Sequence, residues 1–322
     1  MGSIYDLRTP AFLVDLKTLK NNCRVMREKC KSLGVQLRTH MKTHRTKEAG
    51  EYMTAGSKTC ISVSTLSEAE FYASAGYDDI TYAYPLSPDK IPQASQLLSH
   101  LEKFHVLIDN LVVLKALVNN LPKEGKKWSV FLKVDCGYNR AGVSYNDPKS
   151  VELAKEICSK SCVDFQGLYI HEGNAYGCKG EADIKETTAE ATKRLVMFYN
   201  KLKEAGINCP VVTIGSTPSC SKPPEDISGV TEVIGTYPDR GQILIDCGWT
   251  GLSLDSLGKL KTGYCFFEGH PNLKLVKMTQ EIGTVEAVEG LLDSCASAFM
   301  HPVYYVVNGD TVIDKWIPNK GW

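Results

Sequence analysis

The chain has 322 residues, 43% of them hydrophobic, which is enough for one large α/β domain and a smaller second domain. Its 37 basic residues balance 37 acidic residues. A neutral chain gives no electrostatic reason to bind nucleic acid or an anionic membrane, so we expect a small-molecule partner.

The N-terminal and cysteine patterns indicate a protein of a reducing compartment. Residues 1–10 lack the apolar segment of a signal peptide, and no apolar run is long enough to cross a bilayer. The twelve cysteines are scattered and form no CxxC pair. We therefore expect most of them to be buried free thiols, and the protein to be cytoplasmic.

Short β-rich runs alternate with helical patterns as far as about residue 220. The expected strands are 11–15, 35–40, 59–64, 79–84, 104–109, 128–135, 163–171 and 210–216. The clearest helical stretches between them are 16–34, 64–76 and 186–206. This alternation predicts a parallel sheet with helical crossovers. Seven or eight such units favour a closed (β/α)8 TIM-type barrel, with an open doubly wound sheet as the alternative.

The pattern changes near residue 221, where a turn-rich stretch, 221–226, suggests a linker. Strand-like runs follow at 241–246, 264–268, 273–288 and 302–307. Asn308-Gly309 fits a hairpin turn into a last strand at 311–316. The sequence therefore predicts a barrel over residues 10–222 and an all-β domain over residues 223–322.

The stretch 38–44 suggests an active-site lysine. If it is extended, Arg38, His40, Lys42 and His44 point to one face. Three possible cations around one amine disfavour its protonated form, and a neutral amine is what Schiff-base chemistry needs. The alternative is a solvated basic patch.

Two further clusters fall at expected strand ends, where barrel enzymes carry their active sites. Gly215–Ser219 offers small residues and hydroxyls that suit a phosphate, although a plain Ser/Pro turn is an equal alternative. Gly248 offers another glycine at a strand end. A lysine and a phosphate site on one rim point to pyridoxal phosphate.

Another dense cluster of charged residues is the stretch 133–142, which contains Lys133, Asp135 and Arg140. It fits a charged network behind a cofactor or a surface ion-pair loop.

Several motifs resemble one family. Residues 9–22, 38–44 and 133–142 resemble the barrel of alanine-racemase-type pyridoxal phosphate enzymes. Within that group, the chain is most similar to eukaryotic D-serine dehydratases, in the stretches 40–46, 168–176, 215–219, 244–249 and 316–322. D-threonine aldolases are near relatives of these dehydratases. The resemblance covers nearly the whole chain.

The resemblance implies roles by position. Lys42 matches the Schiff-base lysine, and Tyr169 and Tyr176 match tyrosines that approach the cofactor. The positions that match the phosphate site are Ser216, Thr217, Gly248 and Trp249. Relatives with this barrel form homodimers, so a homodimer is expected here.

The C-terminal region departs from the family pattern. The family binds zinc through a His-x-Cys pair, and here Asp293 stands in the histidine position while Cys295 keeps the thiolate. A carboxylate can still bind zinc. Family segments are also missing between Val233 and Ile234 and before Asp293.

The resemblance implies zinc-assisted β-elimination of D-serine to pyruvate and ammonia. Lys42 would remove the Cα proton, and zinc would polarise the hydroxyl group. One alternative is cleavage of the Cα–Cβ bond, as in D-threonine aldolases. Another is a non-catalytic pyridoxal phosphate-binding protein or an inactive isoform. A racemase needs a second base, and the sequence offers no candidate.

Overall fold

The computed structural model describes residues 2–8, 11–123, 125–221, 232–235, 274–278, 283–286 and 301–320. The chain divides into two compact units. We call them the barrel unit (Asn22–Met41, Met53–Pro238 and Gly321–Trp322) and the terminal unit (Met1–Asn21, Lys42–Tyr52 and Asp239–Lys320).

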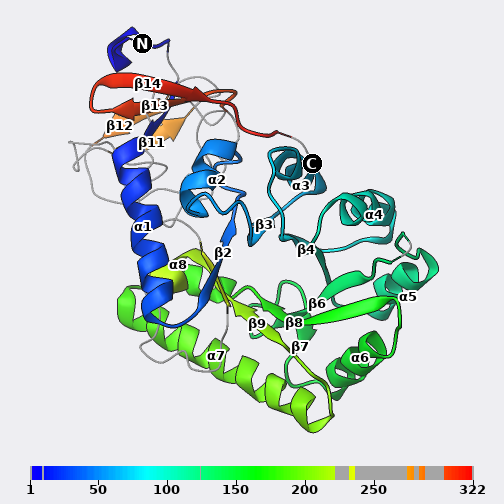
Figure 1. The fold of residues 1–322 in the computed structure, drawn as a ribbon. Coiled ribbons are helices and arrows are strands. Elements are labelled where there is room, and N and C mark those ends of the chain that lie inside the picture. Colours follow the sequence, from blue (N-terminus) through cyan, green and yellow to red (C-terminus); the bar gives the residue numbers. More distant parts are fainter. Residues whose placement is uncertain are drawn as a thin grey trace. The chain divides into compact units, whose positions relative to one another are not determined.

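Eight parallel strands of the barrel unit pair in a closed circuit (Figure 1). They are β2 (Gln36–His40), β3 (Ile61–Val63), β4 (Ile80–Pro85), β5 (Phe104–Ile108), β6 (Trp128–Asp135), β8 (Val163–Ile170), β9 (Val211–Ile214) and β10 (Glu232–Gly235). The pairing of β5 with β6 and of β10 with β2 closes the circuit. A short strand, β7 (Val143–Ser144), adds to the end of β6. The carboxyl ends of the eight strands therefore share one rim.

Helices connect these strands along the chain. They are α1 (Leu16–Ser32), α2 (Lys47–Met53), α3 (Leu66–Ser74), α4 (Ile91–His100), α5 (Leu111–Asn119), α6 (Pro148–Cys158), α7 (Glu181–Glu204) and α8 (Thr217–Ser221). Side chains cap several of them. Thr65 accepts from the backbone N–H of Glu68 in α3, Asn110 from that of Val113 in α5, and Asp147 from that of Lys149 in α6. Three short 3₁₀ helices are η1 (Ile4–Asp6), η2 (Pro88–Lys90) and η3 (Gly173–Gly177).

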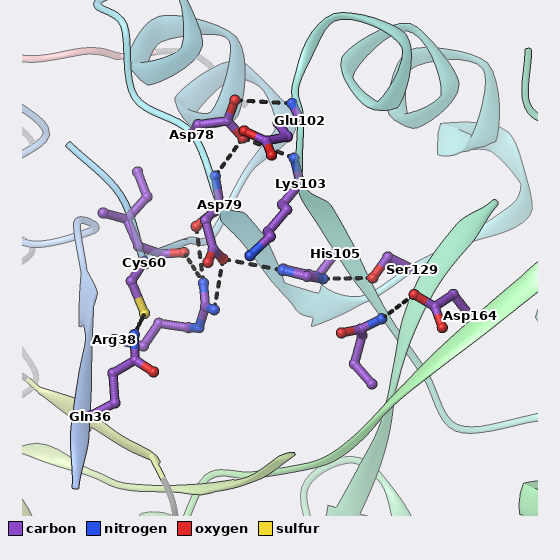
Figure 2. Close-up of polar contacts among 12 residues, drawn as sticks. Gln36, Arg38, Cys60, Asp78, Asp79, Glu102, Lys103, His105, Ser129 and Asp164 are labelled. Atoms are coloured by element: carbon purple, nitrogen blue, oxygen red, sulfur yellow. Dashed lines mark hydrogen bonds and ion pairs between the residues drawn. The ribbon is translucent and has the colours of Figure 1, made fainter. Parts of the chain in front are cut away.

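Apolar side chains fill the middle of the barrel, where Leu107, Phe131 and Tyr169 form one buried cluster. A polar network lies nearer the amino ends of the strands (Figure 2). There the Asp79 carboxylate binds the Arg38 guanidinium at 2.7 Å and His105 Nε2 at 3.1 Å. His105 Nδ1 lies 2.7 Å from the Ser129 hydroxyl. The network links β2 to β4, β5 and β6 on the side of the barrel away from the rim.

Asp79 is the anion of this network. Burial disfavours its charge, but the His105 hydrogen bond and the Arg38 guanidinium outweigh burial, so the pKa of Asp79 lies well below its ordinary value. The carboxylate therefore stays ionised at neutral and mildly acidic pH.

The terminal unit contains a three-stranded sheet. Its strand β1 (Phe12–Asp15) pairs in parallel with β13 (Tyr304–Asn308), which pairs in antiparallel with β14 (Thr311–Trp316). Buried Phe12, Ala49, Tyr304, Val306 and Trp316 form its core. A hairpin joins β13 to β14 as Asn308-Gly309 predicted, but its two turn residues are Gly309, at φ 57, and Asp310, one position later than expected. A separate antiparallel pair joins β11 (Lys274–Met278) and β12 (Gly283–Glu286).

One expected barrel strand pairs elsewhere, and one barrel strand was not predicted. Residues 11–15 do form a strand, but it pairs with β13 and is not the first barrel strand. The circuit is completed by β10, which was expected to belong to the all-β domain. Alternation in the sequence predicts a strand, but it does not predict that strand's partner.

Most of the expected all-β domain lies outside the described residues, as does the boundary at residues 222 and 223, which stays a prediction. No helix among the described residues is long and apolar enough to cross a membrane.

Candidate active site

Two chain segments meet at the rim of the barrel unit. One follows β8 and contains His171, Glu172 and η3. The other is the turn Gly215–Ser219, which follows β9 and leads into α8. Because β8 and β9 are neighbours in the sheet, their carboxyl ends bring these segments together.

Two buried serines hold the turn in shape. The Ser219 hydroxyl accepts from Ser216 N at 2.9 Å and donates to Ser216 O at 3.1 Å. The two serine hydroxyls lie 3.0 Å apart. Ser216 and Ser219 are therefore internal to the turn, and the first role that the structure gives them is to fix its backbone.

The segment after β8 braces the turn from outside. His171 Nδ1 lies 3.1 Å from Gly215 O, and a carbonyl can only accept, so this nitrogen carries the proton. The Tyr176 hydroxyl lies 2.9 Å from the Thr217 hydroxyl. The structure thus brings together Tyr176, Ser216 and Thr217, three of the residues that we predicted to bind the cofactor.

Tyr169 lies one layer deeper. It is buried on β8, with its ring 6.3 Å from that of Phe131 and 5.5 Å from Lys133 Nζ. Burial first, and then the charge of Arg140, lower the pKa of Lys133 to about 7. Lys133 is therefore a buried amine that is only partly charged at neutral pH.

The rest of the 133–142 cluster has a structural explanation. Asp135 accepts hydrogen bonds from the backbone N–H groups of Gly137 and Tyr138 at 2.8 and 2.9 Å, which closes the loop after β6. Arg140 lies over the Tyr138 ring at 5.3 Å.

Tyr138 is a rim residue that sequence reasoning missed. Its ring contacts His171 edge-on, with 5.9 Å between ring centroids. The ring lies so close to Gly173 that a Cβ at this position would come within 2.2 Å of it. The available signal was Gly173 itself, because a glycine in the segment after a strand can mark a close approach of another group.

We had predicted that the segment carrying Lys42 is an extended strand, and this prediction is wrong. Strand β2 ends at His40, and residues 41–44 form a turn. Within the terminal unit, Arg45 takes φ 51 and donates from Nε to Lys42 O at 3.2 Å. Arg45 O accepts from Asn319 N at 2.7 Å, so the C-terminal residues support this turn.

We had predicted three possible cations around the Lys42 amine, and this prediction is wrong for His44 and Arg38. His44 Nδ1 accepts from Thr46 N at 3.0 Å, which leaves the proton on Nε2, and burial lowers the pKa of His44 to about 3. His44 is therefore neutral, and the charge of Arg38 is bound to Asp79. Lys42 and the Gly215–Ser219 turn belong to different compact units, so their proximity is part of the proposal below.

Four predicted site residues, Gly248, Trp249, Asp293 and Cys295, lie outside the described residues. Among the described residues there is no group of three His, Cys, Asp or Glu side chains that could hold a metal ion. The zinc site stays a prediction.

Comparison with known proteins decides the family. The family described as "Alanine racemase, N-terminal domain" matches residues 14–233, and a serine dehydratase domain family matches residues 227–297. The D-serine dehydratase of Dictyostelium discoideum is 33% identical and aligns over 99% of this chain and 98% of its own. The chain belongs to the alanine-racemase-type family. Within that family it groups with the D-serine dehydratases, as the motifs predicted, and this membership makes it a pyridoxal phosphate-dependent lyase.

Solved structures agree with the family. An alanine-racemase-like protein of Idiomarina loihiensis is 30% identical, with a TM-score of 0.85 over 99% of both chains. The D-threo-3-hydroxyaspartate dehydratase of Delftia sp. HT23 shares the fold, with a TM-score of 0.88 at 24% identity over 100% of both chains.

The Dictyostelium alignment also bears on the missing segments. It runs over 389 residues, more than the 322 of this chain. This alanine-racemase-type relative therefore carries residues that the chain lacks, and the two predicted deletions stay a prediction.

Proposed function

We propose that this protein is a pyridoxal phosphate-dependent dehydratase that converts D-serine to pyruvate and ammonia. The observation that carries the proposal is the Gly215–Ser219 turn, which His171 and Tyr176 brace at the rim. Family membership gives the reaction class, and the D-serine dehydratases among the relatives suggest the substrate.

The residues at the rim fit the phosphate of the cofactor. Phosphate oxygens need hydrogen-bond donors, and the rim presents the Tyr176 and Thr217 hydroxyls, joined to each other at 2.9 Å. Ser216 and Ser219 fix the backbone behind them. Gly248 and Trp249 complete the proposed phosphate site.

Lys42 is the proposed attachment point of the cofactor. It follows the carboxyl end of β2 by two residues, and β2 is two strands from β9, with β10 between them. That Lys42 reaches a cofactor whose phosphate lies at the Gly215–Ser219 turn is what the resemblance implies, and it is tested by locating the lysine that carries the cofactor.

The reaction needs one base and a way to release the hydroxyl group. Pyridoxal phosphate, when bound, supplies the electron sink for the electrons of the Cα–H bond. The Lys42 amine would be the base that takes the Cα proton of the substrate. Asp293 and Cys295 would hold the zinc ion, which in this proposal polarises the β-hydroxyl of D-serine.

The alternative functions can be distinguished by the products that the protein forms. The D-threonine aldolase of Arthrobacter is 28% identical over 66% of this chain, so aldol-type cleavage is the second candidate. It would give glycine and an aldehyde in place of pyruvate. Bound cofactor without turnover would indicate a non-catalytic protein or an inactive isoform, for which the shorter chain is the supporting observation.

We also propose that the protein is cytoplasmic and forms a homodimer. The nine cysteines of the described residues are free thiols, which supports a cytoplasmic protein. A homodimer is expected from the resemblance, and light scattering on the purified chain tests it.

The test uses the full chain reconstituted with pyridoxal phosphate. We expect pyruvate from D-serine, bound zinc by metal analysis, and a cofactor absorbance band that Lys42→Ala abolishes. Lys31→Ala, an exposed lysine in the last turn of α1, is the matched control. A Lys42→Ala protein with unchanged absorbance and turnover would refute the role of Lys42.

A further inference from the structure

Glu172 is a buried acid directly behind the proposed phosphate turn. Glu172 lies between β8 and η3 and is only 2% exposed. Helices α7 and α8 both pack against η3. The hydroxyls of Thr188 on α7 and Ser219 in the turn lie close to its carboxyl group.

No basic side chain forms an ion pair with Glu172 in the part of the chain that the structure describes. Among the titratable groups near Glu172 are the thiols of Cys136, after β6, and Cys220, in α8, whose pKa values a charged Glu172 would raise. Burial raises the pKa of both thiols, so they are neutral and supply no countercharge.

The carboxyl group is therefore poised between its two forms. Burial raises the pKa of Glu172 to about 7, and the hydroxyls of Ser219 and Thr188 only partly oppose this shift. Glu172 Oε2 has no hydrogen-bond partner of normal geometry among the described residues. A second negative charge nearby would favour the protonated form further.

The turn responds to the form that Glu172 takes. The Ser219 hydroxyl has one proton, which it donates to Ser216 O at 3.1 Å. A neutral Glu172 leaves that proton in place, whereas an ionised Glu172 competes for it. The ionised form would also repel a phosphate dianion at the turn.

We propose that Glu172 is a positioning residue that takes up a proton when a phosphate dianion binds at the Gly215–Ser219 turn. This inference rests on the proposed function, which puts the cofactor phosphate there. Protonation removes the repulsion and keeps the Ser216–Ser219 hydrogen bond that shapes the turn.

The experiment is calorimetry of pyridoxine 5′-phosphate binding to the full-length apoprotein, near pH 8, in buffers of different ionisation enthalpy. The probe has no aldehyde, so it cannot bond to Lys42, and its phosphate is already a dianion because that pKa is about 6. We expect uptake of up to about one proton, and affinity that falls by up to about tenfold per pH unit above pH 7. Glu172→Gln should take up no proton and show little pH dependence. Glu186→Gln, on the exposed surface of α7, should behave as wild type.

The outcomes are distinguishable. Equal proton uptake by wild type and Glu172→Gln overturns the inference and leaves the phosphate site standing. Failure of the wild type to bind the probe at any pH overturns the phosphate site and the inference together. If Glu172→Gln does not fold, infrared difference spectra of the wild type decide. A protonated-carboxyl band gained on binding supports the inference, and its absence overturns it.

Discussion

Arg38 and Asp79 join the middle of β2 to the start of β4 through an ion pair of 2.7 Å. Arg38 also donates to the backbone carbonyls of Ile61 and Asp79, at 3.2 and 3.0 Å. Both side chains are largely removed from water, so each charge depends on the other.

Asp79→Asn is expected to lower the free energy of unfolding by about 3–5 kcal/mol, because it leaves the Arg38 charge buried without its partner. Denaturant unfolding of the apoprotein measures this change. Glu28→Gln removes one partner of an exposed ion pair with Arg24 and should cost less than about 1 kcal/mol. A similar small effect for both variants would contradict the structural role of Asp79.

His44 predicts an acid-sensitive fold. Its pKa is about 3 in the folded chain and 6.5 ordinarily, so its contribution is complete above pH 6.5 and is lost as the pH falls towards 3. At pH 5 the expected loss is about 2 kcal/mol relative to pH 8. His44→Asn, whose side-chain oxygen can still accept from Thr46 N, should lack this part of the pH dependence. Identical pH profiles of unfolding for the two proteins would refute the argument.

Gly167 allows β8 and β9 to approach. It has φ 132, and a Cβ there would lie 1.8 Å from Val211 O. Gly167→Ala should therefore separate two strands of the circuit and strongly destabilise the barrel unit. Gly76→Ala, at φ 81 with open space around it, should cost only about 1 kcal/mol of backbone strain. Thermal unfolding compares the two variants, and equal shifts would argue against a steric role for Gly167.

The sequence predicts much of this fold because its signals are local. Alternating β and α patterns predicted strands close to β2, β4, β5, β6, β8 and β9, and Asn308-Gly309 predicted the turn between β13 and β14. The pairing of β1 with β13 and the place of β10 in the circuit are long-range choices, which local alternation does not encode.

The candidate site shows the same division. Motifs located the Gly215–Ser219 turn and Tyr176, whose hydroxyl contacts Thr217. Charge counting around Lys42 failed, because it treated His44 as a cation although burial makes it neutral. Sequence reasoning assigned no role to Glu172, because its buried position behind the turn depends on the packing of η3 against α7 and α8.

The most direct test of the account is to identify the lysine that carries the cofactor. Borohydride reduction of the full chain with bound pyridoxal phosphate, followed by proteolysis and mass spectrometry, fixes and locates the pyridoxyl group. The account predicts this group on the peptide that contains Lys42. Its presence on another lysine, such as Lys133, or its absence from every peptide, would contradict the central claim.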